Sequence, residues 1–147
     1  MGQPAGTTSS RTVMAVMRWS DMDALGHVHN ARMLEYFEAA RVELIQEVLD
    51  LGRIEPADIG LIVRRHEIDY LAPLVFRPTP IAVDMSVERI GSSSFTLAYS
   101  VGEPDNSITY ASAITVIVAV TASSGRPTEI PQALRDHLIR YSSGEGD

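Results

Sequence analysis

The chain of 147 residues contains no cysteine and no lysine. Without cysteine there are no disulfide bonds, no thiolate metal ligands and no cysteine nucleophile. All 12 basic residues are therefore arginine, and 19 acidic residues bring the formal net charge to -7. Because binding to a phosphate backbone requires a basic surface, this charge argues against nucleic acid as a partner.

Long apolar runs are also missing. The longest, ASAITVIVAV, is far shorter than the roughly 20 residues that a transmembrane helix needs. The opening stretch MGQPAGTTSS has neither the basic start nor the apolar centre of a secretory signal. We therefore expect a cytoplasmic protein with no membrane partner, made of one domain over 12–140 with flexible tails at 1–11 and 141–147.

The apolar spacing predicts one long helix over 31–50. Five apolar residues recur there at steps of three and four: Met33, Phe37, Ala40, Leu44 and Val48. Asn30 is a suitable N-cap for this helix, and Gly52 lies just past its expected end. Glu38 and Arg41 stand three residues apart, and we expect them to form an ion pair on the helix.

The rest of the chain has the two-residue period of strands. Strands are predicted over 12–19, 61–72, 81–88, 95–101 and 108–121, followed by a short helix over 131–140. On the last strand, small side chains gather on one face, which permits a helix to pack closely against it. The predicted fold class is α+β, with one antiparallel sheet of about five strands and one long helix.

The segment RWSDMDALGHVHN, just before the helix, is dense in polar residues and allows three interpretations. The first is a metal site, because DMDALG resembles the start of a calcium-binding loop. Leu25 and Arg32 stand where that loop needs ligands, however. His27 and His29 are two residues apart and would point in opposite directions in an extended loop, so no metal is expected.

The second interpretation is purely structural. Asp21 would then form a turn, Gly26 would supply a positive φ angle, Asn30 would cap the helix, and His27 would pack with a hydrogen bond. Each of these roles is common in proteins. Taken together, they leave the presence of two acids and two histidines in one connection unexplained.

The third interpretation is catalytic. Unpaired N–H groups at a helix start can stabilise a carbonyl oxygen that acquires negative charge. Asp23, a few residues upstream, can face the same carbonyl as a nucleophile or as a base for water. Since carboxylates are weak in both roles, the substrate should be activated, and a thioester fits better than an amide. The chain has no G-x-S-x-G motif, because GSSSF lacks the second glycine.

The motif D-x-D-x-x-G-H-V-x-N-A, followed by E-x-A-R, resembles the hotdog-fold thioesterases of the 4-hydroxybenzoyl-CoA thioesterase type. The matching residues are Asp21, Asp23, Gly26, His27, Val28, Asn30, Ala31, Glu38, Ala40 and Arg41. The order of predicted elements is also similar, so that the resemblance covers about residues 12–122. It implies a hotdog domain, in which a curved antiparallel sheet wraps around one long helix.

The resemblance further implies an acyl-CoA thioesterase that needs no cofactor and hydrolyses a fatty or aromatic acyl thioester. The family's catalytic carboxylate falls at Asp23, and the N–H groups around Asn30 and Ala31 would polarise the carbonyl. His27 and Asn30 would shape the loop or bind the catalytic water, and Gly26 would let the loop turn around the substrate. Homodimers or homotetramers with active sites between subunits are expected.

One departure concerns the coenzyme A phosphates. The founding members of the family bind them with basic side chains at a turn that here reads RIGSSSF, where only Arg89 is basic. Ser92, Ser93 and Ser94 remain as neutral donors for a phosphate. The carrier of the acyl group is therefore coenzyme A or an acyl carrier protein.

Two other functions remain open at this stage. A hotdog hydratase of enoyl thioesters has Asp and His five residues apart, whereas here Asp21 and Asp23 precede His27 by six and four. A non-catalytic acyl-CoA binding module would use the same fold without turnover.

Overall fold

The computed structural model describes residues 9–50 and 59–142. In chain order its elements are β1 (Arg11–Ala15), the 3-10 helix η1 (Trp19–Asp21), α1 (Asn30–Asp50), β2 (Ile59–Tyr70), β3 (Ile81–Ile90), β4 (Ser94–Gly102), β5 (Thr109–Thr121) and α2 (Gln132–Ile139). Gly52, the expected residue beyond the helix end, lies outside the described residues, as do most of the two expected tails.

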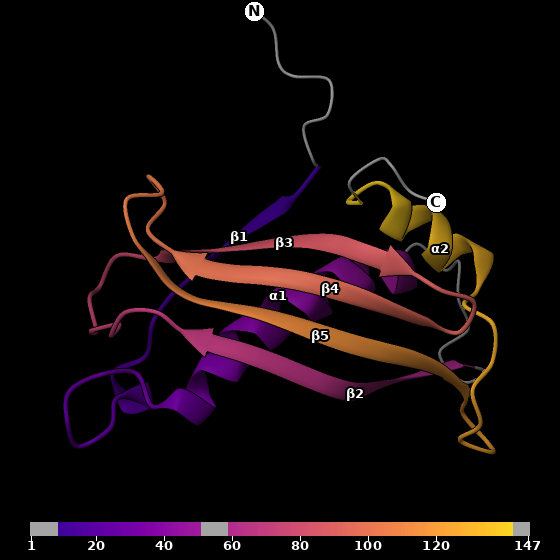
Figure 1. Ribbon diagram of the computed structural model, residues 1–147, viewed down its shortest axis with the longest axis horizontal. Coiled ribbons are helices and arrows are strands. Elements are labelled where there is room, and N and C mark those ends of the chain that lie inside the picture. The colour runs from indigo at the N-terminus through magenta and orange to yellow at the C-terminus, as the bar shows by residue number, and fades with distance from the viewer. Residues whose placement is uncertain (1–8, 51–58, 143–147) are drawn as a thin grey trace, which may run out of the picture.

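The five strands form one sheet in the order β1-β3-β4-β5-β2, and every neighbouring pair is antiparallel. Helix α1 crosses one face of this sheet, and the short α2 lies near the end of β3 (Figure 1). The predicted α+β class is thus confirmed. Neither helix in the described part of the chain is long and apolar enough to cross a membrane.

The core lies between α1 and the sheet. The apolar helix residues that set the predicted period, from Met33 to Val48, are at most 3% exposed, which confirms the helical register. The Phe37 ring packs against Tyr99 of β4 with a centroid separation of 5.1 Å. On β5 the small side chains Ala111, Ala113, Thr115 and Ala119 are buried, so that the helix can approach the sheet closely.

Two strands end earlier than predicted. The first strand ends at Ala15, opposite Ile81 at the start of its partner β3, and a 3-10 turn follows in which the Asp21 N–H donates to the carbonyl of Arg18. The second strand ends at Tyr70, because the N–H groups of Leu71 and Ala72 both donate to the Tyr110 carbonyl. Both ends depend on contacts between residues far apart in the chain, which the apolar pattern does not encode.

Strand β2 forms an edge of the sheet. Its 12 residues pair with β5, and its other side has no neighbouring strand among the described residues. Exposed charged side chains cover the middle of this edge, with Arg64 and Arg65 followed by Glu67 and Asp69. The strand is thus basic first and acidic afterwards.

Replacing a core leucine tests the packing of α1. Leu44 is 0% exposed, so Leu44→Ala should lower the free energy of unfolding by about 2–5 kcal/mol through lost burial and the remaining cavity. Leu25 is 81% exposed, and Leu25→Ala should change it by less than about 0.5 kcal/mol. Urea unfolding measures both values, and equal losses in the two variants would contradict this packing.

Candidate active site

The dense polar segment folds as a tight loop at the start of α1. Met22 and Val28 form an isolated antiparallel bridge, and the Asp23 N–H donates to the His27 carbonyl at 2.8 Å. Within this loop the Gly26 N–H donates back to the Asp23 carbonyl, and Gly26 has a φ of 86°. That angle disfavours residues with a Cβ, so the predicted turn role of Gly26 is confirmed.

Asp21 anchors the loop to the helix. Its carboxylate is 1% exposed and accepts hydrogen bonds from the Tyr36 hydroxyl at 2.7 Å and from Arg18 Nε at 3.1 Å. Its carbonyl accepts the N–H of His29 at 2.9 Å. Burial and the neighbouring carboxylate both raise the pKa of Tyr36, which keeps the hydroxyl protonated as a donor.

The helix cap is His29 and not Asn30, so the prediction for Asn30 was wrong by one position. The His29 carbonyl accepts the N–H groups of Arg32 and Met33, and His29 Nδ1 accepts the N–H of Ala31 at 3.1 Å. Among the first four helix N–H groups, only that of Asn30 has no acceptor in the described part of the chain. A free donor therefore remains at the positive end of the helix.

A hollow of about 420 Å³ opens beside this donor. Three of the predicted catalytic residues line it, namely Asp23, His27 and Asn30, together with residues that include His29, Met33 and Tyr70. The Tyr70 hydroxyl donates to the Asn30 carbonyl at 2.9 Å and so fixes the end of β2 against the helix start. Sequence reasoning missed His29 as a cap and missed Tyr70, because their contacts depend on the loop and on strand pairing.

The carboxylate of Asp23 is held by the loop's own amides. Its Oδ1 accepts the N–H groups of Leu25 at 2.9 Å and of His27 at 3.2 Å. The hydrogen bond from the His27 amide is the main reason why the pKa of Asp23 lies below its ordinary value. Asp23 is thus ionised at neutral pH, and its Oδ2 accepts no hydrogen bond from the described residues. Asp23, with this carboxylate oxygen, and Asn30, with its free N–H, therefore line the same hollow, which suits attack on a carbonyl group.

The residues predicted to bind coenzyme A lie far from this hollow in the structure. Arg89 and Ser92–Ser94 are at the end of the sheet where β2 begins, whereas Asp23 lies at the end where β2 finishes. The nine residues of β4 alone put about 30 Å between these ends. Arg135 of α2, which sequence reasoning missed, donates to the carbonyls of Gly91 and Ser92 at this turn. Within one chain, the residues predicted to bind coenzyme A and Asp23 therefore lie at opposite ends of the sheet.

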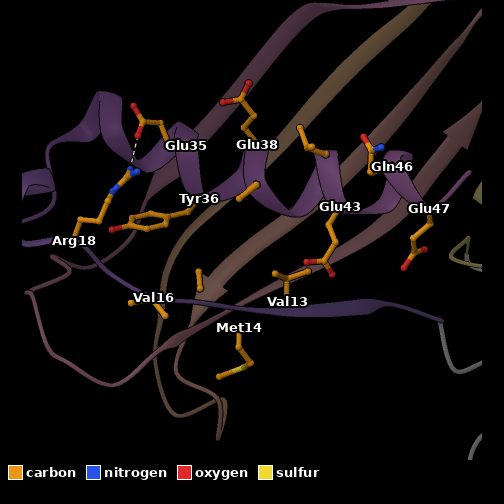
Figure 2. A pocket seen from close by; sticks show the side chains of 13 residues that line it. Val13, Met14, Val16, Arg18, Glu35, Tyr36, Glu38, Glu43, Gln46 and Glu47 are labelled. Atoms are coloured by element: carbon orange, nitrogen blue, oxygen red, sulfur yellow. Dashed lines mark hydrogen bonds and ion pairs between the residues drawn. The ribbon is translucent and has the colours of Figure 1, made fainter. Parts of the chain in front are cut away.

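A larger hollow of about 820 Å³ lies between β1 and α1. Figure 2 shows Glu43 and Glu47 pointing from α1 towards β1, while Glu38 and Gln46 point away. This hollow contains no predicted site residue and no free helix N–H, and we place the site at the smaller one. In the residues that the structure describes, no three His, Asp or Glu side chains gather as metal ligands.

The chain that carries this geometry matches a known protein family. Residues 17–138 match the thioesterase-like superfamily. The match includes the polar loop, all of α1 and the sheet from β2 to β5. No curated protein sequence matches the chain.

Several solved structures are similar over most of their length. The PA5185 protein of Pseudomonas aeruginosa is 29% identical, with a TM-score of 0.82, over 91% of this chain and 92% of that chain. A thioesterase of Thermus thermophilus, complexed with coenzyme A and Zn, is 30% identical with a TM-score of 0.69, over 87% and 90%. The 1,4-dihydroxy-2-naphthoyl-CoA thioesterase Slr0204 of Synechocystis is 17% identical, with a TM-score of 0.74 over 90% and 96%, and shows the fold alone. The predicted hotdog fold is confirmed.

The loop geometry predicts how Asp23 titrates. In the folded protein its pKa should lie below the ordinary value of 3.8, because the amides of Leu25 and His27 stabilise the carboxylate. Gly26→Ala should raise the pKa towards that value, since alanine disfavours the φ of 86° and loosens the loop. NMR titration of the aspartate carboxyl carbons measures the pKa of Asp23 in both proteins. A pKa of Asp23 above 3.8 in the unmodified protein would contradict the observed hydrogen bonds.

Proposed function

Because the chain belongs to the thioesterase-like superfamily, we propose that it hydrolyses the thioester of a fatty or aromatic acyl-CoA to the free acid and coenzyme A. One observation carries this proposal. The ionised carboxylate of Asp23 and the free N–H of Asn30 line the same hollow. The solved thioesterase with bound coenzyme A, 30% identical to this chain, supports coenzyme A as the carrier.

In the proposed reaction, the thioester carbonyl oxygen accepts a hydrogen bond from the Asn30 N–H, with the positive helix end behind it. Oδ2 of Asp23 then either attacks the carbonyl carbon or removes a proton from an attacking water. On the first route a mixed anhydride forms and the coenzyme A thiolate leaves, and water then hydrolyses the anhydride. On the second route water adds directly and the thiolate leaves with a proton.

The other predicted residues take supporting roles in this proposal. His27 donates its backbone N–H to Asp23, and its side chain lines the hollow, where a catalytic water would sit. Ala31 can act as a second oxyanion donor only after the His29 ring turns away, because its N–H is already bound to Nδ1. Asn30 is thus the first oxyanion donor.

The separation between Asp23 and Arg89 supports an active site shared by two subunits. If two copies pair antiparallel along β2, the Ser92–Ser94 turn of one copy comes to the sheet end that holds Asp23 of the other. The charges along β2 favour this pairing, because the basic half of one strand then faces the acidic half of its partner. A homodimer is thus the smallest complete enzyme that we propose.

Removing the carboxylate tests the reaction. Asp23→Asn should lower kcat by at least about a hundredfold, the loss seen when a group that stabilises a transition state is removed. It should leave the fold and the binding of acyl-CoA in place, because asparagine has nearly the same shape. Release of free thiol from short, long and aromatic acyl-CoAs measures the effect, with Asp136→Asn, at an exposed position of α2, as the matched control. Equal rates for Asp23→Asn and the unmodified protein would remove Asp23 from the mechanism.

A mixing experiment tests the shared site. Asp23→Asn and the charge-reversing Arg89→Glu should each be poorly active alone, the first in kcat and the second in KM. When the two variants are unfolded and refolded together, mixed dimers contain one site with both residues intact, so activity should return. Native mass spectrometry confirms that mixed dimers form. Mixed dimers without recovered activity would show that Arg89 does not complete the site of its partner subunit.

A further inference from the structure

The charged middle of β2, the outermost strand in Figure 1, alternates between the two faces of the sheet. Residues 65–70 pair regularly with residues 111–116 of β5, and Arg64 just before them is an extra residue with no partner on β5. His66 lies opposite the buried Thr115, so its ring is on the side of α1. Successive side chains of a strand point to opposite faces. The outer face therefore carries the odd-numbered residues Arg65, Glu67 and Asp69.

Two copies that pair antiparallel along β2 have few possible registers. In an antiparallel pair, directly opposite side chains lie on the same face of the sheet. Two identical strands related by a two-fold axis therefore bring one residue opposite its own copy at the axis. Because the basic part of β2 is to meet the acidic part of the partner strand, the axis has to lie within residues 65–68.

The charges on the outer face distinguish these four positions. An axis at Arg65 brings two arginines together, and an axis at Ile68 brings Glu67 opposite the partner's Asp69. An axis at Glu67 gains two pairs of Arg65 with Asp69 but places two glutamates opposite each other at the centre. An axis at His66 brings Arg65 opposite the partner's Glu67 twice, and no like charges are directly opposite within 65–67. Opposite charges in this position stabilise strand pairing and like charges weaken it.

The ion pair within one chain fits the axis at His66 as well. Arg65 and Glu67 of the same strand already form a salt bridge. Two copies paired about His66 join two such salt bridges into a ring of four charges that alternate in sign. Each charge in this ring has an opposite charge beside it along its own strand and another across the interface.

The side chains that face α1 favour the same register. If Arg64 is the extra residue in both strands, an axis at His66 brings Ile68 opposite the partner's Val63, so two apolar side chains meet. Val63 is 38% exposed in the single chain, and this contact would cover it. An axis at Glu67 would instead bring the His66 ring opposite the apolar Ile68.

The surroundings of His66 make this register sensitive to acid. Its Nδ1 lies 2.9 Å from the Thr115 hydroxyl of β5. Burial and the charge of Arg41 on α1 lower the pKa of His66, while Glu38 on α1 acts in the opposite direction. The ring is therefore neutral at neutral pH. A partner brings the same groups, so protonation would place two positive rings opposite each other, with a guanidinium group on either side.

We infer that a second copy of this chain binds the outer edge of β2 with His66 on the two-fold axis, and that the dimer loosens when the two rings are protonated. This inference rests on the shared active site of the proposed function, to which it adds a register and a loss of the site in acid. Because both rings take up a proton more readily in separate chains, the Kd of the dimer should rise by up to about a hundredfold per pH unit as the pH falls.

A cysteine scan tests the register, because the chain has no cysteine of its own. The variants Arg65→Cys, His66→Cys, Glu67→Cys and Ile68→Cys are oxidised mildly at neutral pH, with the exposed Asp136→Cys as the control for random collisions. Only a cysteine on the axis has its copy directly opposite, with Cα atoms about 5 Å apart. One position away from the axis, the Cα atoms of the two copies are more than about 7 Å apart, too far for a disulfide.

The His66→Cys variant should therefore form covalent dimers at least about tenfold faster than the other four, as measured on non-reducing gels. Arg65→Cys and Glu67→Cys chains, when mixed, should form a disulfide with each other, and this result does not require the His66 variant to fold. Fastest crosslinking of Arg65→Cys, Glu67→Cys or Ile68→Cys with its own copy would overturn the register, as would crosslinking of all variants at the rate of Asp136→Cys.

Sedimentation between pH 8 and pH 5 tests the effect of acid. The Kd of the unmodified dimer should rise by at least about tenfold over this range, because protons bind the separated chains more tightly. His66→Gln should lose this dependence, since its side chain does not titrate. The control His27→Gln removes a histidine of the polar loop and should keep the dependence. Equal pH dependence in His66→Gln and the unmodified protein would overturn the inference.

None of these measurements uses a thioester, so they separate this inference from the proposed reaction. If the dimer forms with His66 on the axis and no acyl-CoA is hydrolysed, the proposed function fails and the register stands. If acyl-CoA is hydrolysed while the scan shows another axis, the register fails and the reaction stands.

Discussion

The hydrogen bonds of one buried aspartate determine the geometry of the candidate site. Asp21 receives the Tyr36 hydroxyl from the first turns of α1 and Arg18 Nε from the segment after β1, while its carbonyl receives the His29 N–H. These three bonds fix where the loop leaves the sheet and where the helix begins. The carboxylate of Asp23 and the free N–H of Asn30 are separated by this same loop, so their relative position depends on Asp21. In the reaction that we propose, Asp23 and Asn30 need such an anchor, because a small shift of either group would reduce its effect on a reacting carbonyl.

Much of the fold follows from periodicity in the sequence. The helix register could be predicted because burial selects every third or fourth residue from Met33 to Val48, and the small face of β5 could be predicted because alanines alternate with larger residues. The strand ends could not, since they depend on bonds such as that of the Leu71 N–H with the Tyr110 carbonyl. Those bonds join residues far apart in the chain, and no local pattern records them.

Part of the candidate site could be predicted because its residues lie close together in the sequence. Asp23, His27 and Asn30 line one hollow, as expected from their closeness in the sequence. The cap was assigned to Asn30 because asparagine is a frequent cap, whereas the ring of His29 takes that role here and occupies the Ala31 N–H. Tyr70 and Arg135 reach their places through strand pairing and helix docking. The Glu38–Arg41 pair expected from helical spacing is only a loose contact, because Glu38 Oε2 lies 3.8 Å from Arg41 Nη2.

The outer edge of β2 also affects whether the chain pairs with extended segments of other proteins. The outer edge of this 12-residue strand, which pairs with no strand among the described residues, offers backbone donors and acceptors to any extended segment, including those of other newly made proteins. The charged side chains from Arg64 to Asp69 stand at the middle of that edge, where an uncharged segment that pairs with it would have to desolvate them. Such charges act as gatekeepers against unselective aggregation. The charges at the middle of this edge therefore disfavour pairing with uncharged segments of other chains.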